Sequence, residues 1–160
     1  MAATSSSSYS SQEKYEVFLD FRGEDTRDRF SGHLYHALRQ KHILTYKDDE
    51  NLESGHEISK IMEAIRESKI CIIVFSQDFA SSTWCLDEVV RILDCKRDGN
   101  DFIITIVYEI DPSIVRKQNK SYAYAFTKHE ERFKASMDKV QRWRDALKEV
   151  AGLSGHKNKA

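Results

Sequence analysis

The run of apolar residues at positions 70–75, Ile-Cys-Ile-Ile-Val-Phe, constrains the fold more than any other stretch of the sequence. It shows no alternation of polar and apolar residues, which is typical of a strand that is buried on both faces. Such strands lie inside parallel sheets that helices cover on both sides. The run therefore predicts an α/β protein with this strand near the centre of its sheet.

Hydrophobic periodicity and turn residues predict three further strands and five helices. The strands are expected at 15–21, 43–46, 70–75 and 102–107, and the helices at 30–41, 58–65, 83–93, 122–133 and 139–150, with Gly152 ending the last one. This alternation predicts a doubly wound, flavodoxin-like three-layer fold. We expect a central parallel sheet of order 2-1-3-4, with room for a fifth strand, and helices on both faces.

The length and composition suit a single domain. A chain of 160 residues with 40% hydrophobic residues can bury one substantial core and leaves little room for a second. We expect a disordered Ser-rich leader at 1–12, one domain at 13–152, and a tail or the start of a linker at 153–160.

The 25 basic and 26 acidic residues nearly cancel, so no overall charge attracts nucleic acid or a membrane. The three cysteines lack CxxC spacing, which is typical of reduced cytoplasmic thiols.

The segment after the central strand brings an aromatic ring close to a carboxylate. Ser82 can cap a helix there, and an apolar stripe at helical spacing follows, formed by Leu86, Val89, Val90 and Leu93. Trp84 and Glu88 lie one turn apart and off that stripe. In open α/β sheets this end of the strands is where ligands bind. Glu88 is either a solvated helix carboxylate or a catalytic carboxylate beside a stacking platform, and the local pattern leaves both interpretations open.

Two polar loops are expected at the same end of the sheet. The first, Arg22–Arg27, follows the first strand and leads into a helix. The second, at 47–56, contains Gly55 and is longer than packing requires. Long loops at this end of a sheet are often functional, so the second loop is a candidate lid.

Several segments together resemble the plant TIR domain, the N-terminal module of many intracellular immune receptors. They are Tyr15–Arg27, Ser81–Glu88, Asp111–Gln118, Val140–Arg144 and Leu153–Gly155. They keep their order and cover nearly the whole chain from residue 15 to residue 155. A match of this length is far more specific than any short motif.

The resemblance implies an enzyme of plant innate immunity. The family's activity is NAD+ glycohydrolysis, which releases nicotinamide together with ADP-ribose or cyclic and related nucleotide signals. NAD+ or NADP+ is then a substrate, and no metal is required. Because the family's sites assemble between subunits, the expected partners are further copies and other TIR domains, and activity is expected only in an oligomer. The expected location is the cytoplasm, with the nucleus as an alternative, and neither a membrane nor nucleic acid is an expected partner.

The resemblance also assigns roles to individual residues. Glu88 matches the family's catalytic glutamate, and Trp84 matches the aromatic residue near it. The first ligand loop is matched by Arg22, Gly23, Glu24, Asp25, Thr26 and Arg27. Glu53 and Gly55 match the flexible loop after the second strand.

The chemistry agrees with these roles. Nicotinamide is already a cationic leaving group, so cleavage needs no general acid, and one carboxylate suffices to stabilise an oxocarbenium-like centre. We expect Glu88 to be partly desolvated beside Trp84, whose indole face can stack a planar ring. Arg22 and Arg27 suit contacts to phosphate or ribose. The loop is not a GxGxxG, so no Rossmann fingerprint is present.

Each of these residues also has a structural explanation. Trp84 can simply pack at the base of its helix, and Glu53 can merely hold its loop. The two arginines can pair with the neighbouring Glu24 and Asp25 as an ordinary charged loop. Cys85 lies beside the site, but no partnered histidine is evident for a thiol nucleophile. The remaining candidates are His33 and His36, which share a helical face without a third nearby metal ligand.

Several positions depart from the family pattern. Gly32 replaces a usual serine in a self-contact region, and Ser54 replaces an arginine in the second loop. Lys120 replaces a glycine, and its long charged side chain can obstruct a second contact surface. Thr105 and Ile114 replace a proline and an aspartate.

Two other functions therefore stay open. The first is a non-catalytic adaptor or decoy that acts only through association with other TIR domains. The second is a phospho-receiver, which the acidic residues Asp20, Asp48 and Asp49 suggest. The receiver is the weaker alternative because Phe75 and Ser76, rather than a phosphoacceptor aspartate, end the central strand.

Overall fold

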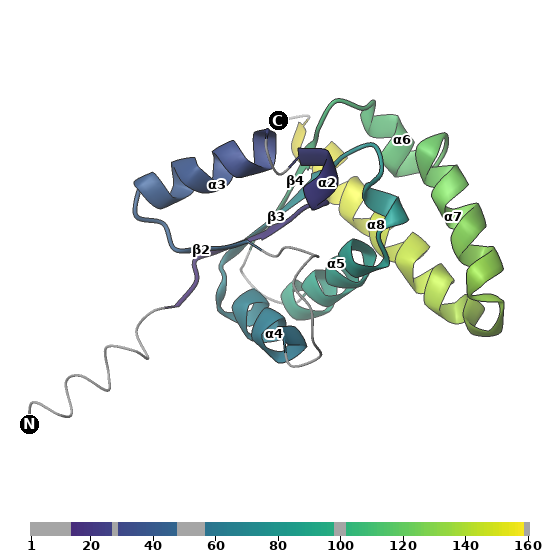
Figure 1. Cartoon of the computed structure of the whole chain (residues 1–160), viewed down its shortest axis with the longest axis horizontal. Helices are drawn as coiled ribbons and strands as arrows, with labels where there is room; N and C mark the ends of the chain where they lie inside the picture. Colours follow the sequence, from purple (N-terminus) through teal and green to yellow (C-terminus); the bar gives the residue numbers. More distant parts are fainter. Residues whose placement is uncertain (1–13, 27–28, 48–56, 98–101, 159–160) are drawn as a thin grey trace, which may run out of the picture.

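The computed structural model describes residues 14–26, 29–47, 57–97 and 102–158, and Figure 1 shows their arrangement. The elements in chain order are β1 (Val17–Asp20), α2 (Gly23–Thr26), α3 (Phe30–Gln40), β2 (Thr45–Lys47), α4 (Glu57–Glu67), β3 (Ile70–Phe75), η1 (Phe79–Ser81), α5 (Thr83–Lys96), β4 (Phe102–Val107), α6 (Pro112–Lys117), α7 (Ser121–Arg132), η2 (Lys134–Ser136) and α8 (Met137–Asn158). The sheet runs β2-β1-β3-β4, and every pair is parallel. The predicted fold class and strand order are confirmed.

Strand β3 is the inner strand that the apolar run predicts. It pairs with β1 on one side and with β4 on the other, so that Ile70 lies beside both Val17 and Phe102. Five of its six residues are buried. Alternate residues of a strand point to opposite faces of the sheet, so Ile73 and Phe75 enter one core and Ile72 and Val74 enter the other.

Helices cover the two faces unequally. Figure 1 shows α3 on one side of the sheet and α4 and α5 on the other. Helix α8 lies on the α5 side, because it packs against α5 and contributes Trp143 and Leu147 to the same core. The larger core therefore lies between the sheet and the layer formed by α4, α5 and α8.

Side-chain caps fix the starts of two helices. The hydroxyl of Ser82 accepts a hydrogen bond of 3.1 Å from the backbone N–H of Cys85, which confirms that Ser82 caps α5. The carboxylate of Asp111 accepts one of 2.9 Å from the N–H of Ser113 at the start of α6. Pro112 is the first residue of α6, where its missing N–H costs nothing.

Three local expectations were wrong. The loop expected at Arg22–Arg27 contains the short helix α2, in which the N–H of Thr26 bonds to the carbonyl of Arg22 at 3.3 Å. The helix α6, at Pro112–Lys117, is absent from the helices that the sequence predicts. The last helix continues through Gly152 to Asn158, since one glycine costs a helix only about 1 kcal/mol and the buried Val150 and Ala151 hold it in place.

Strand β4 is less buried than its apolar sequence predicts. Phe102 is 55% exposed and Ile104 is 39% exposed. Within the described residues β4 is an edge strand. The residues that pack on the α3 side come from its later half and beyond, namely Ile106 and Tyr108.

Lys120 has an unusual backbone conformation. Its φ of 50° and ψ of −121° lie in a region that glycine adopts far more easily than other residues. The glycine that the resemblance leads us to expect at this position would adopt this conformation without strain. Residues 1–13, including the expected leader, lie outside the described part of the chain, as do residues 48–56 and 98–101. Among the described helices, none combines the length and the apolar composition that crossing a membrane requires.

Candidate functional site

Glu88 is an acidic side chain in a buried position. It lies on α5, in the segment that follows β3, and its exposed fraction is 0%. Helix α5 contacts α4, α8 and β1, so its flanks are covered as well as its apolar stripe. The solvated interpretation of Glu88 is therefore wrong, and the side chain is more deeply buried than the partial desolvation that the sequence predicts.

No described residue forms a hydrogen bond with either oxygen of the Glu88 carboxylate. Lys96, on the same helix, is 5% exposed but donates from Nζ to the backbone carbonyls of Ser68 and Arg66. Buried charged groups are normally paired in this way, because an unpaired one costs several kcal/mol. Unpaired groups of this kind concentrate at functional sites.

Trp84 lies on α5 one turn before Glu88. It is half-buried and packs against the larger core. The next residue, Cys85, is buried, and its Sγ donates to the carbonyl oxygen of Phe21 at 3.5 Å. The start of α5 is therefore attached to the chain directly after β1, and helical geometry places Trp84 and Glu88 on one side of the helix.

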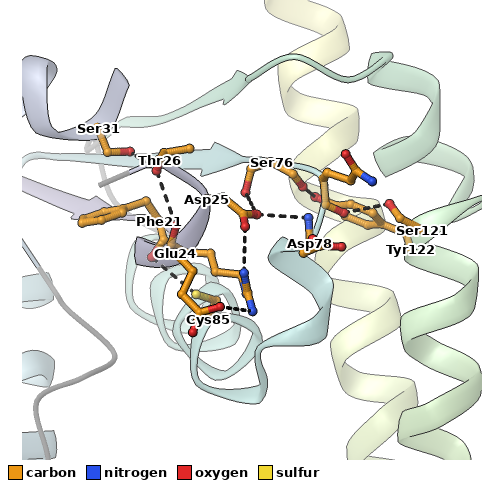
Figure 2. A network of polar contacts seen from close by, with 12 residues as sticks. Phe21, Glu24, Asp25, Thr26, Ser31, Ser76, Asp78, Cys85, Ser121 and Tyr122 are labelled. Carbon is orange, nitrogen blue, oxygen red and sulfur yellow. Dashed lines mark hydrogen bonds and ion pairs between the residues drawn. The ribbon is translucent and has the colours of Figure 1, made fainter. Parts of the chain in front are cut away.

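Asp25 joins two loops at the carboxyl ends of the strands (Figure 2). Its Oδ1 accepts a hydrogen bond from Arg22 Nη1 at 2.7 Å. Its Oδ2 accepts one from Ser76 Oγ at 2.6 Å and another from the backbone N–H of Asp78 at 3.1 Å. Arg22 also pairs with Glu24 at 3.0 Å. The pairing of Arg22 with its acidic neighbours, expected as the alternative to ligand binding, is thus confirmed in this single chain.

Helix α7 holds the same loop from the other side (Figure 2). The hydroxyl of Tyr122 donates to the carbonyl of Ser76 at 2.8 Å, and the hydroxyl of Ser121 donates to the carbonyl of Gln77 at 2.7 Å. Burial, more than the nearby carboxylate of Asp25, raises the pKa of Tyr122 well above its ordinary value of 10.0. Tyr122 therefore stays protonated and remains a donor.

A small crevice opens beside this junction. Its volume is about 200 Å³, and its lining includes Asp25, Ser76, Asp78, Tyr108 and Glu109. It lies just beyond the carboxyl ends of three strands, where ligands bind in this class of fold. Neither Trp84 nor Glu88 contributes to its walls, so the crevice and the proposed catalytic carboxylate are separate places.

The other residues of the predicted ligand loop differ in accessibility. Gly23 is buried, and Thr26 is 1% exposed, with its hydroxyl 2.6 Å from that of Ser31. The side chain of Glu24 is 69% exposed. Arg27, Glu53 and Gly55 lie outside the described residues, as does Ser54. Their assigned roles stay predictions.

Sequence reasoning missed the contacts that hold this region together. Trp143 Nε1 on α8 donates to Asp87 Oδ1 on α5 at 2.9 Å, across a separation of 56 residues. The bond between Asp25 and Ser76 spans 51 residues. A single sequence carries no signal for such pairs, because each partner resembles an ordinary helix or loop residue.

Comparison with known proteins identifies the family. The family model described as the TIR domain matches residues 14–160. This chain belongs to the TIR family. The TMV resistance protein N of Nicotiana glutinosa is 49% identical over 151 residues, which are 94% of this chain and 13% of that protein. The disease resistance protein RPV1 of Vitis rotundifolia is 49% identical over 142 residues, which are 88% of this chain and 10% of that protein.

A solved structure matches the fold of this TIR domain. TIR domains in the activated Roq1 resistosome, which directly recognises the pathogen effector XopQ, have a TM-score of 0.79 and 51% sequence identity. The match covers 89% of this chain and 87% of the other. The TIR domain is thus similar to a module of plant disease resistance proteins and spans only about an eighth or less of the curated relatives' length.

Proposed function

We propose that this TIR domain is a self-associating NAD+ glycohydrolase of plant innate immunity. It cleaves NAD+, or NADP+, to nicotinamide and ADP-ribose or to cyclic and related nucleotide signals. The observation that carries the proposal is the carboxylate of Glu88, which is completely buried and has no partner among the described residues. A fold retains such a destabilising group when the group has a chemical task.

Glu88 supplies the negative charge that the reaction needs. The bond between the ribosyl C1′ and the nicotinamide nitrogen breaks, and its electron pair leaves with neutral nicotinamide. Positive charge then develops on the ribosyl ring, and a carboxylate in a low-dielectric site stabilises it far more than one in water does. Water adds to C1′ and gives up a proton, which the carboxylate can accept. Trp84 offers an indole face for stacking one of the planar rings.

Self-association is part of this mechanism. Because Glu88 has no exposed surface in the single chain, a substrate can reach it only after the surrounding segments move. A second copy is a suitable cause of that movement, since contacts between copies can favour an open arrangement that is minor in the single chain. The relationship to TIR domains of an activated resistosome supports the same view.

The decisive experiment compares Glu88→Ala with wild type. Concentrated protein is incubated with NAD+, and nicotinamide release is followed by chromatography. We expect turnover that rises faster than in proportion to protein concentration and a loss of at least about 100-fold in Glu88→Ala, as for removal of a group that stabilises transition-state charge. Asp94→Ala is the matched control, because Asp94 is on the same helix with a side chain that is 66% exposed. It should keep wild-type turnover.

A second candidate is an adaptor or decoy that acts only by binding other TIR domains. Because Glu88 has no exposed surface, a substrate cannot contact it in the single chain, and Arg22 pairs with Asp25 within the same chain. Both observations favour this candidate. Failure to release nicotinamide even under crowded conditions, combined with concentration-dependent association, would select this candidate. Equal turnover in wild type and Glu88→Ala would refute the assignment of the catalytic residue.

A further inference from the structure

The helix that carries Glu88 is anchored at the preceding residue. Asp87 Oδ1 accepts a hydrogen bond of 2.9 Å from Trp143 Nε1. Trp143 is 1% exposed and is among the largest fully buried side chains of the chain. A buried indole has few alternative positions, and its N–H needs an acceptor. The bond therefore fixes Asp87 against a part of the core that does not move easily.

The surroundings of Trp143 extend this anchor to the start of α5. Its ring packs against His129 at a centroid distance of 5.2 Å and against Phe133 at 5.5 Å. His129 Nε2 lies 2.7 Å from the carbonyl oxygen of Ala80, so Nε2 is the donor, since a carbonyl only accepts. Residues from Ala80 to Asp87 are thus held at both ends by α7 and α8.

The position of Asp87 on α5, directly before Glu88, determines how its bond to Trp143 affects the catalytic side chain. Successive residues of an α-helix are rotated by about 100° around the axis, so a bond at Asp87 sets the rotation of the helix and hence the direction in which Glu88 points. The bond between Cys85 and Phe21 holds the same turn from the β1 side. A catalytic group that is displaced by about 1 Å can lose about 100-fold in rate.

We propose that Asp87 and Trp143 are positioning residues, which hold α5 in the rotation that aligns the Glu88 carboxylate. The inference deepens the proposed function and rests on it. It assigns to the α8 layer a role in the reaction besides stability, although neither residue is expected to touch the substrate.

The test begins with Asp87→Ala, Asp87→Asn and Trp143→Phe in the full chain. Asp87→Ala and Trp143→Phe both remove the bond, and each should lower kcat about tenfold while KM changes less than about twofold. Asp87→Asn keeps a carbonyl oxygen as the acceptor, so it should retain kcat within about twofold. Measurements are made well below the thermal midpoint of every variant, so that a smaller folded fraction does not contribute.

The double variant Asp87→Ala with Trp143→Phe separates positioning from stability. If the two residues act through their shared bond, the double variant loses no more kcat than either single variant. Losses that multiply to about 100-fold would overturn the proposal, as would unchanged kcat in Asp87→Ala or an equal loss in Asp87→Asn.

Hydrogen exchange gives an answer that does not depend on turnover. Amides of the first turns of α5 should exchange faster in Asp87→Ala than in wild type, but not in Asp87→Asn. If wild type releases no nicotinamide, the proposed function fails, and this measurement then decides whether the anchor exists. Wild-type exchange in Asp87→Ala would refute the anchor even where the NAD+ glycohydrolase is active.

Discussion

The two faces of the sheet bury very different amounts of apolar surface. Among the described residues, the core on the α4, α5 and α8 side contains 24 buried residues, whereas the core beneath α3 contains five. We call the side with the larger core the thick side. It contains Glu88, the proposed catalytic residue, together with Trp143 and Tyr122. The proposed catalytic residue is therefore located where the packing is most constrained, whereas the α3 side contributes mainly the second cover of the sheet.

Leucine truncations on the two faces should give the largest difference. Leu86, on α5, is 0% exposed, whereas Leu34, on α3, is only partly buried. We expect Leu86→Ala to lower the free energy of unfolding by about 3 to 5 kcal/mol and Leu34→Ala by about 1 to 2 kcal/mol. Urea unfolding at neutral pH measures both. Equal costs would mean that the two faces contribute alike to stability.

The thick side also contains a group that opposes folding. Replacing Glu88 with leucine removes a buried carboxylate without a described partner, so Glu88→Leu should raise the free energy of unfolding by about 1 to 3 kcal/mol while abolishing turnover. The control is Asp94→Leu at an exposed position of the same helix, with an expected change within about 0.5 kcal/mol. A loss of stability in Glu88→Leu would show that the carboxylate is paired in solution.

His129 should make the free energy of unfolding depend on pH. Burial, assisted by the charges of Arg132 and Arg144, lowers the pKa of His129 from its ordinary value of 6.5, although its bond to the carbonyl of Ala80 acts in the opposite direction. Below pH 6.5 His129 is therefore protonated to a greater extent in the unfolded chain than in the folded chain. The stability that His129 contributes is complete above that pH and is lost as the pH decreases through the lowered pKa.

The variant His129→Phe keeps a ring but cannot titrate. It should lose about 1 kcal/mol of stability at pH near 7.5 because the carbonyl of Ala80 loses its donor. The difference from wild type should shrink at pH near 5.5, where only wild type is penalised for burying the imidazole. Urea unfolding at both pH values measures this, and a constant difference would contradict the assigned direction of the pKa shift.

The fold was predictable because its signals are local. The apolar run of β3 and the cap at Ser82 each depend on a few adjacent residues, and together with the helical periodicity they determine the order of the elements. Local signals also misled, since β4 has the sequence of a buried strand but forms an edge among the described residues. Burial depends on which neighbours cover a strand, which a single sequence does not specify.

The candidate site was only partly predictable for the same reason. The resemblance drew attention to Glu88 and Trp84, but it did not indicate that Glu88 is completely buried. Asp25 was assigned to the ligand loop, yet its two carboxylate oxygens accept hydrogen bonds from Arg22, Ser76 and Asp78. Hydrogen bonds between residues far apart in the chain determine which side chains remain available to a substrate.

The bond between Asp87 and Trp143 has a consequence for the order of events during protein synthesis. Its partners are 56 residues apart, so at about 5 to 20 residues per second a ribosome finishes the first roughly 3 to 11 seconds before it adds the second. Throughout that interval the nascent chain already contains the carboxylate of Glu88 but lacks Trp143, which we propose helps to orient it. Newly made copies are therefore expected to be inactive until α8 has emerged and packed against α5.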